Sequence, residues 1–432
     1  MWLAAMTRGL LLGRGRAATR RPGFHAEEEG GGNALITYGG DAHLLTIAPT
    51  GAGKGVGCVI PNALLYPGPL IVFDPKGEAY AVTKRRREAL GQKVVLLDPF
   101  GASGGASADG LNPLDLAGLI DPGRPEDAAA SLATLLTGGQ VSHKDPFWDV
   151  TAHAFLTGLL TWMLADCPPE ERRFSRLYEL FAEGDLPYQL ATLLDSGVIR
   201  HPTAYAETAA FLGHPERETR PSVQSTTRQH LPLFGSAAVR SATDRTSFDL
   251  GDLVEGRPLS LFIIVPPTKL LSHRPVVRLW LGALILALAA RRRMPARRTL
   301  MLIDEAAQLG PMPPLIQTAT LLRSAGVTLW TFFQSPAQLE ATYGGEAMVL
   351  VDNAGVVQLF APRNGRMAEA YARLLGDVAP ETVMGLARDE QLLLLEGGRS
   401  FRARRINYLH DPLCVGLFDP HPGRPFSREG IE

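Results

Sequence analysis

Cysteine is scarce in this chain of 432 residues, and the three cysteines, Cys58, Cys167 and Cys414, are far apart and form no C-x-x-C pair. This spacing favours neither a disulfide framework nor a zinc site, and it fits a reducing cytoplasm. Long hydrophobic runs are also missing, because the longest apolar stretches, 279–290 and 152–165, fall short of the roughly 20 residues that a spanning helix needs. We therefore expect buried helices there, a cytoplasmic location and no transmembrane helix.

A strong net charge is absent too, since the formal charge is −1. Basic clusters at 84–87, 291–298 and 399–405 are expected to be solvated helix ends or loops, with contact to nucleic-acid phosphate as the alternative. The N-terminus is apolar first and arginine-rich afterwards, the wrong order for a signal peptide. We expect residues 1–33 to form a basic, disordered tail. At 45% hydrophobic residues, the chain is long enough for a full core and a second domain.

A glycine-rich turn with one lysine follows the apolar strand 44–48, and it reads Pro49-Thr50-Gly51-Ala52-Gly53-Lys54-Gly55. Glycines let backbone N–H groups converge on a β-phosphate, the next helix presents its positive end, and Lys54 can reach the β- and γ-phosphates. The Walker A match is incomplete, because Ala48 stands at the first glycine and Gly55 replaces the hydroxyl residue that would ligate magnesium. Residues 50–55 predict an ATP-binding loop, and a plain glycine turn before a buried helix is the alternative.

A second apolar strand, 299–303, ends in the paired carboxylates Asp304 and Glu305. Such a run fits a strand buried on both faces of a parallel sheet, whose carboxyl ends form the ligand-binding edge. In the Walker B role, Asp304 would hold the Mg²⁺ shell and Glu305 would polarise the attacking water. The alternative is a helix start whose first turn favours acids. A phosphate loop in the same chain favours the Walker B role, because phosphoryl transfer needs a cation cradle and a metal-holding carboxylate together.

Two further polar residues stand where phosphate chemistry could use them. Gln334 follows the strand 327–333 and could sense the γ-phosphate or orient the lytic water, with capping of the helix that begins at Ser335 as the alternative. Arg323 lies near a helix end, where a cation favours the helix dipole. It could also project into a neighbouring subunit's phosphate site, and an arginine supplied in trans can be worth about 10³ to 10⁵ in rate.

The order of the expected elements indicates one α/β domain built from two chain segments. Buried strands are expected at 44–48, 70–74, 94–98, 259–265, 300–304, 327–333, 356–360 and 392–395. Their alternation with helices predicts right-handed crossovers and a mostly parallel sheet. Between the third and fourth strands the sequence reads as successive amphipathic helices. The expected boundaries are the tail 1–33, a nucleotide-binding segment 34–145, an all-helical inserted domain 146–247, a second nucleotide-binding segment 248–418 and a flexible tail 419–432.

Several short motifs, in order along the chain, give a specific resemblance. They are A-P-T-G-A-G-K-G-V-G at 48–57, I-P-N at 60–62, F-D-P-K-G-E at 73–78, L-N-P-L-D at 111–115, F-W at 147–148, and Q-S at 334–335 with Q-L at 338–339. The chain resembles the TraG/TraD-type coupling proteins of type IV secretion, the conjugative DNA-transfer ATPases related to the FtsK and HerA motors. The similarity runs from about residue 34 to residue 410.

This resemblance implies a RecA-like P-loop NTPase with a helical domain between Walker A and Walker B. It implies a ring of six at the cytoplasmic mouth of the secretion channel. Lys54, Asp304, Glu305, Gln334 and Arg323 fall on the family's positions for phosphate binding, metal, water activation, sensing and the arginine finger. The family tolerates a glycine at the position of Gly55.

The function implied is ATP hydrolysis with Mg²⁺, coupled to delivery of a relaxase-bound single strand of DNA or another nucleoprotein substrate. Relaxosome proteins and the ATPases or membrane components of the channel are the implied partners. Family members typically begin with two membrane-spanning helices, for which there is no room before Leu44. The chain is therefore expected to be a soluble homologue, a product that works with a separate membrane partner, or a shortened chain, and a peripheral position at the inner membrane face is one alternative. The alternatives are a HerA/FtsK-like duplex translocase unconnected with secretion and a nucleotide-dependent adaptor that recruits protein effectors.

Overall fold

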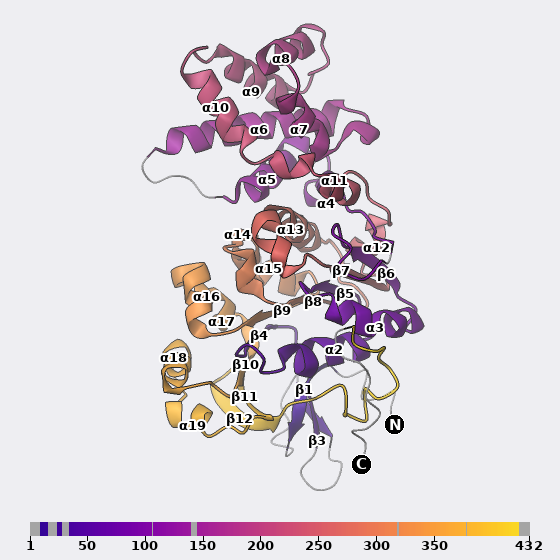
Figure 1. Cartoon of the computed structure of the whole chain (residues 1–432), viewed down its shortest axis with the longest axis vertical. Helices are drawn as coiled ribbons and strands as arrows, with labels where there is room; N and C mark the ends of the chain where they lie inside the picture. The colour runs from indigo at the N-terminus through magenta and orange to yellow at the C-terminus, as the bar shows by residue number, and fades with distance from the viewer. Residues whose placement is uncertain are drawn as a thin grey trace.

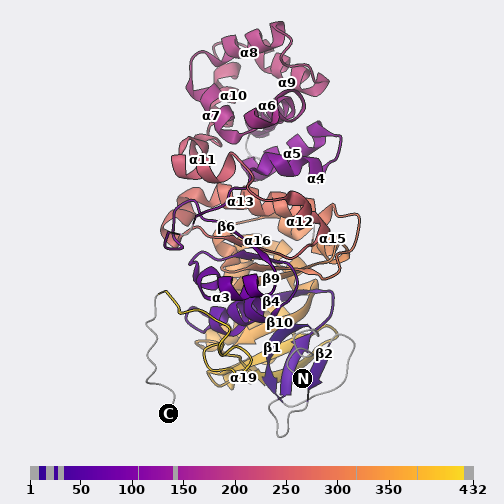
Figure 2. The same ribbon diagram turned by 90° about the vertical axis from the view of Figure 1, so that its right-hand side faces the viewer.

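The structure, a computed structural model, describes residues 9–15, 24–27, 34–105, 107–139, 145–317, 319–376 and 378–422. A mixed sheet with helices on both faces carries a stack of helices at one end of the molecule (Figures 1 and 2). The expected α/β class with a mostly parallel sheet is confirmed.

The sheet has 12 strands in the order β2-β3-β1-β12-β11-β10-β4-β9-β8-β5-β7-β6. Neighbours are parallel from β10 through β4 to β6, and antiparallel from β10 through β11 to β2. The strands are β1 (Leu10–Gly15), β2 (Phe24–Glu27), β3 (Ala34–Tyr38), β4 (His43–Ile47), β5 (Leu70–Phe73), β6 (Lys93–Leu97), β7 (Leu259–Ile263), β8 (Thr299–Ile303), β9 (Val327–Phe333), β10 (Ala354–Phe360), β11 (Glu390–Leu395) and β12 (Arg399–Arg404). The eight strands from β4 to β11 follow the expected runs to within a few residues, whereas β1, β2, β3 and β12 were not expected.

Strand β1 corrects the expectation that residues 1–33 are a disordered tail. Leu10, Leu11 and Leu12 are buried, and β1 lies in the sheet between β3 and β12. The backbone N–H of Leu11 donates to Asn62 Oδ1 at 2.8 Å, and Asn62 Nδ2 donates back to Leu11 O at 2.9 Å. Because Asn62 belongs to the helix after the glycine-rich turn, β1 braces that helix. The remaining parts of the expected tail, 1–8, 16–23 and 28–33, lie outside the described residues, as does 423–432.

The helices on the sheet belong to two chain segments. The first segment contributes the π-helix η1 (Gly55–Val59), α2 (Ile60–Leu65) and α3 (Glu78–Ala89). The second contributes α13 (Pro267–Ala289), η5 (Ala306–Leu309), α14 (Pro313–Gln317), α15 (Ala319–Ser324), α16 (Pro336–Tyr343), η6 (Gly344–Glu346), α17 (Ala347–Asp352), α18 (Gly365–Leu375) and α19 (Pro380–Met384).

In the part of the chain that the structure describes, every element between β6 and β7 is a helix. These are η2 (Pro113–Leu116), α4 (Ala117–Ile120), α5 (Pro125–Thr137), α6 (Pro146–Asp166), η3 (Pro169–Glu171), α7 (Phe174–Ala182), α8 (Leu186–Asp195), α9 (Pro202–Gly213), α10 (Thr219–Arg228), η4 (Pro232–Gly235), α11 (Ala237–Thr243) and α12 (Leu250–Glu255). The helical run therefore begins before the expected border at residue 146, and α5 packs on both α6 and α13. The borders of an independent helical domain stay a prediction.

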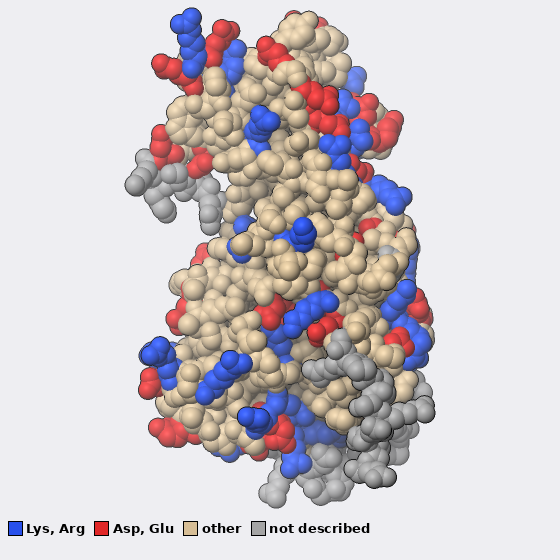
Figure 3. Space-filling model, in the orientation of Figure 1, with Lys and Arg blue, Asp and Glu red and all other residues tan. Residues whose placement is uncertain are grey.

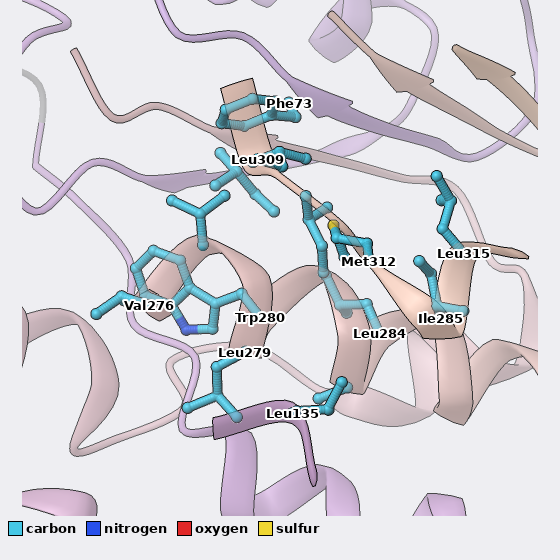
Figure 4. Packing of buried hydrophobic residues seen from close by; sticks show 14 of the residues in the cluster. Phe73, Leu135, Val276, Leu279, Trp280, Leu284, Ile285, Leu309, Met312 and Leu315 are labelled. Atoms are coloured by element: carbon cyan, nitrogen blue, oxygen red, sulfur yellow. The ribbon is translucent and has the colours of Figure 1, made fainter. Parts of the chain in front are cut away.

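Helix α13 joins the helical stack to the sheet (Figures 1 and 2). Among the described residues it is the helix that is long and apolar enough to cross a membrane by length and composition. Its Trp280 and Leu284 are fully buried, and they lie between Phe73 of β5 and Leu135 of α5 (Figure 4). A Cβ on Gly282 would lie 2.3 Å from Leu135 Cδ2, so this glycine allows the close crossing of α13 and α5. The apolar stretch 279–290 is thus a core helix, as expected.

The parallel strands separate two hydrophobic cores. Alternate residues of β5, such as Ile71 and Val72, point into different cores, and β4 and β8 behave alike. One core contains the buried residues of α13, and the other contains those of α2 and α3. Burial on both faces explains why these strands read as continuous apolar runs.

Two of the basic clusters contain buried arginines, which corrects the expectation of solvated clusters. Arg87 is fully buried, and Arg291 is 9% exposed. The guanidinium of Arg291 donates to Leu253 O at 2.5 Å and to Thr299 Oγ1 at 2.9 Å. Both side chains therefore hold elements together and are not available to a nucleic acid.

Candidate active site

The glycine-rich turn lies at the carboxyl end of β4, near the middle of the sheet. Gly51 and Gly53 have φ angles of 75° and 87°, which a residue with a Cβ adopts only with strain. A Cβ on Gly55 would meet no atom within 4 Å, so the turn opens to its surroundings there. The helix that follows starts as the π-helix η1, a form often found at functional sites. The backbone thus has the shape of a phosphate cradle.

Strand β8, two places from β4 in the sheet, brings its terminal carboxylates to this turn. Lys54 Nζ forms an ion pair with Glu305 Oε1 and lies 3.3 Å from Asp304 Oδ1. Glu305 has a φ of 51°, the one positive φ of a non-glycine residue in the described chain. Strain of this kind concentrates at functional sites, and here the Glu305 N–H donates to Asp304 Oδ1 at 2.9 Å. Lysine and both carboxylates therefore form one cluster.

Gln334 connects this cluster to the glycine-rich turn. Its Nε2 donates to Glu305 Oε2 at 2.7 Å, and its Oε1 accepts from Thr50 Oγ1 at 2.7 Å. Ser335 caps helix α16 by accepting from the Gln338 N–H at 3.2 Å, so the side chain of Gln334 is not the cap. The amide is thus oriented at both ends.

Burial sets the electrostatics of the carboxylates. It raises the pKa of Asp304, which the charge of Lys54 lowers and that of Glu305 raises. Asp74, which follows β5 beside β8, is also buried, and burial together with the charge of Asp304 raises its pKa to about 7. Asp74 accepts from the Ala79 N–H at 2.7 Å and so holds the start of α3. Asp74 belongs to the F-D-P-K-G-E motif, and the sequence analysis assigned no separate role to it.

Two arginines that the sequence reasoning missed also contact the turn. Arg363 Nη2 donates to Thr50 O, and Arg405 Nη1 donates to Ala52 O. Arg363 lies three residues after the expected strand 356–360 and at the carboxyl end of β10, so its position after a parallel strand was a signal for it. Arg405 follows β12, a strand that was not expected, and it stood in the sequence only as part of a basic cluster.

Arg323 is not brought to this site. Its Nη2 pairs with Asp41 Oδ1 at 2.7 Å, where both side chains are about half exposed. Asp41 precedes β4, whereas the glycine-rich turn follows it. The five residues of β4 span about 16 Å. Arg323 therefore lies at the amino-terminal ends of the parallel strands, whereas Lys54 lies at their carboxyl ends. Its role in trans stays a prediction, as do the roles of the clustered residues.

The cluster fits a nucleotide with Mg²⁺. The cradle is open at Gly55, and Lys54 supplies a cation. Asp304 and Glu305 supply hard oxygen ligands of the type that Mg²⁺ prefers, usually as one or two carboxylates completed by phosphates and water. Among the described residues there is no group of three or more acidic, His or Cys side chains placed to enclose a metal alone. The donor set therefore suits a metal shared with phosphates.

Comparison with known proteins gives consistent relatives. Residues 14–379 match the family described as "Type IV secretory system Conjugative DNA transfer". The conjugal transfer protein TraG of Escherichia coli is 26% identical over 431 residues, covering 94% of this chain and 67% of TraG. Protein VirD4 of Rhizobium radiobacter is 25% identical over 426 residues, covering 90% of this chain and 60% of VirD4. The chain thus spans about two thirds of the length of these relatives.

Solved structures show the same fold. The plasmid coupling protein TrwB in complex with the GTP analogue GDPNP has a TM-score of 0.64 at 17% identity, covering 86% of this chain and 88% of TrwB. TrwB in complex with ADP and Mg²⁺ has the same TM-score at 16% identity. VirB4 of Thermoanaerobacter pseudethanolicus has a TM-score of 0.53 at 17% identity, covering 92% of this chain and 96% of VirB4. The expected RecA-like architecture is confirmed by these likenesses.

Proposed function

The chain belongs to the Type IV secretory system conjugative DNA transfer family, and from this premise we propose that it is an ATP-hydrolysing coupling protein. It delivers DNA, most simply a relaxase-bound single strand, to a type IV secretion channel. The names of TraG and VirD4 support the system, and the complexes of TrwB with nucleotides and Mg²⁺ support the cofactors. The observation that carries the enzymatic part is the cluster of Lys54, Asp304, Glu305 and Gln334 over the glycine-rich turn.

In this proposal, ATP binding separates Lys54 from Glu305. The Lys54 ammonium pairs with Glu305 and Asp304, and the phosphates of ATP compete for the same ammonium through charge-assisted hydrogen bonds. When Lys54 turns to phosphate, the Glu305 carboxylate becomes able to accept a proton from the attacking water. Binding of ATP thereby makes the Glu305 carboxylate available as the general base.

Gln334 and Asp304 complete the site around the Glu305 carboxylate. Gln334 holds Glu305 Oε2 and is itself held by Thr50 of the turn, so the carboxylate stays directed at the phosphate site. Asp304 would hold Mg²⁺, which, when bound, neutralises charge on the β- and γ-phosphates. Positioning and electrostatics supply most of the catalysis of phosphoryl transfer, and they are what this cluster offers.

We place the protein in a homo-hexamer at the inner face of the membrane, where it meets the relaxosome and the channel. The face shown in Figure 3 carries acidic and basic side chains interspersed with wide uncharged areas. On the part of this face that the structure describes, the basic side chains form no continuous track for a phosphate backbone.

Two substitutions test the ATPase site. Lys54→Ala should abolish ATP binding, because Lys54 contacts ground-state phosphate, whereas Glu305→Gln should bind ATP normally and hydrolyse it about 10² to 10⁴ times more slowly. Lys93→Ala and Glu340→Gln, which change exposed residues elsewhere, are the matched controls. Equal ATP affinity of the wild type and Lys54→Ala, measured by equilibrium titration, would contradict the assignment.

A further inference from the structure

The glycine-rich turn is held between two groups of side chains of opposite charge. Asp304 and Glu305 reach it from β8, on one side of β4. Arg363 and Arg405 reach it from β10 and β12, on the other side of β4 in the sheet order. The two arginines approach the two positive-φ glycines, since a Cβ on Gly51 would lie 4.0 Å from Arg363 Nη2 and a Cβ on Gly53 3.5 Å from Arg405 Nη1. Both guanidinium groups therefore touch the part of the turn that is built for close approach.

Arg405 is held in place without using its full hydrogen-bonding capacity. Its guanidinium stacks over the Phe360 ring, with the guanidinium carbon 4.6 Å from the ring centroid. Its Nε is buried and has no hydrogen-bond partner among the described residues, although Nη1 donates to Ala52 O. A guanidinium has five donors in a fork that matches phosphate oxygens, and leaving a buried donor unpaired costs free energy. The Phe360 ring therefore holds the Arg405 guanidinium beside the glycine-rich turn while the Nε donor has no partner among the described residues.

The charge balance of the cradle gives these arginines a purpose. Lys54 is shared between two carboxylates, and Gly55 supplies no hydroxyl for a metal ligand. A nucleoside triphosphate brings several negative charges to this place, and a guanidinium compensates phosphate charge through charge-assisted, often bidentate hydrogen bonds. The arginines already lie at the turn, where phosphate oxygens would compete with the backbone carbonyls of Thr50 and Ala52 for their donors.

We propose that Arg363 and Arg405 bind the phosphates of a nucleotide held by the same chain and close the cradle from the side opposite the Walker B pair. The carbonyls of Thr50 and Ala52 are the partners they leave on binding. This inference rests on the proposed function, because it names further binding residues for the same nucleotide. It separates these two arginines, which act in cis, from Arg323, which is predicted to act in trans.

The test is the dependence of nucleotide affinity on the number of phosphates. AMP, ADP and a non-hydrolysable ATP analogue are titrated against the full-length wild type, Arg363→Gln and Arg405→Gln. We expect each variant to lose little affinity for AMP and about 10-fold to 100-fold for the ATP analogue, the range for hydrogen bonds to charged groups. Arg366→Gln and Arg404→Gln, both exposed and within three residues of the residues tested, should bind all three nucleotides like the wild type.

The result also separates phosphate binding from a structural role. An equal loss for AMP, ADP and the analogue, or no loss at all, would overturn the inference and leave the arginines as supports of the turn. Arg363 is exposed, so its variant should fold even if Arg405→Gln does not, and thermal melts of both report this directly. If the wild type itself binds no nucleotide, the proposed function fails and this inference with it. If the wild type binds and the variants are unchanged, the inference alone fails.

Discussion

Glu305 is the residue on which the local structure converges. Its strained backbone turns the carboxylate back toward the glycine-rich turn, where Lys54 holds one oxygen and Gln334 the other. A positive φ on a non-glycine residue costs of order 1–3 kcal/mol, and the ion pair and hydrogen bonds of the cluster offset that cost. Gln334 contacts the Glu305 carboxylate and Thr50, so its removal should affect the general base.

Gln334→Ala should slow ATP hydrolysis by about 10² while leaving ATP affinity close to that of the wild type, because its target is the general base. Gln317→Ala, an exposed glutamine on α14, is the control. Steady-state turnover and equilibrium nucleotide titration on the same preparations separate the two effects. Unchanged turnover would reduce Gln334 to a structural link between β9 and the turn.

At this scale the sequence predicted three residues that follow parallel strands, but it missed Arg363 after the parallel strand β10 and Arg405 after the antiparallel strand β12. Lys54, Glu305 and Gln334 each lie in the segment that follows an apolar parallel strand, where open α/β sheets bind ligands. Arg405 follows β12, whose residues alternate between Arg402 and Arg404 on the outside and smaller or aromatic residues inside. Because of these charges, the antiparallel strand β12 lacks the continuous apolar run by which the other strands were predicted.

At the scale of elements, buried polar side chains hold two elements in place: the helix that follows the glycine-rich turn, and strand β4. Arg87 donates from Nε to Ser260 Oγ at 2.8 Å and from Nη2 to Gly68 O at 2.7 Å, and it also bonds Ala63 O and Tyr66 O. Burial lowers its pKa to about 9. These carbonyls lie at and after the end of α2, so Arg87 terminates the helix that begins at the glycine-rich turn.

Arg87→Lys should lower the free energy of unfolding by about 2–4 kcal/mol, because an ammonium cannot reach all of these acceptors and buried carbonyls are left unpaired. Arg85→Lys, a change at a half-exposed neighbour on the same helix, should stay within about 0.5 kcal/mol of the wild type. Denaturant unfolding of both variants measures the difference. Equal stability of the two would show that Arg87 is not a structural anchor.

His43, at the start of β4, makes the stability of the folded chain depend on pH. Its Nδ1 accepts from the Leu329 N–H at 3.1 Å, so Nε2 carries the proton and donates to Ala319 O at 2.5 Å. Burial lowers the pKa of His43 below the ordinary 6.5. The unfolded chain therefore binds a proton that the folded chain resists, and stability should fall as the pH drops below about 6.5.

His43→Gln should reduce this acid-side loss, because a glutamine does not titrate. His410→Gln, at an exposed histidine, should keep the wild-type slope. The free energy of unfolding, measured from about pH 8 to pH 5.5, gives the comparison. Parallel curves for the wild type and His43→Gln would contradict the assignment.

The element scale also shows where sequence reasoning ended. The parallel strands were found because burial on both faces makes them apolar throughout, as in β5 and β8. Strands β1, β2, β3 and β12 were missed; β1 is mixed with glycine and arginine, and β12 is half exposed. The helical segment was found, but its start at Pro113 was not, because η2, α4 and α5 follow a glycine-rich loop that reads as a break in the pattern.

At the scale of the whole molecule, the position of Arg323 separates what one chain can do from what a ring can do. The guanidinium lies at the sheet edge opposite its own glycine-rich turn and pairs with Asp41 at the surface. It can compensate transition-state charge only in a neighbouring chain. Catalysis is therefore predicted to be shared between subunits.

Specific ATPase activity should rise with protein concentration as rings form, and Arg323→Ala should bind ATP normally but hydrolyse it about 10³ times more slowly or worse. Asp41→Asn is the matched control, because it breaks the same ion pair and keeps the arginine. Mixing Arg323→Ala with Lys54→Ala should restore some activity, since each supplies what the other lacks at mixed interfaces. Constant activity per chain on dilution, with no rescue in the mixture, would rule out a finger in trans.

The central claim is that ATP hydrolysis at this cluster is coupled to DNA, and the ATPase rate with and without DNA tests it most directly. The rate of the wild type is measured at a fixed salt concentration, because salt weakens DNA binding steeply. Single-stranded DNA should stimulate hydrolysis more than duplex DNA does, and Glu305→Gln should show no stimulation. A rate that neither form of DNA changes, at concentrations where the protein binds ATP and forms rings, would contradict the account and favour a nucleotide-dependent adaptor of proteins.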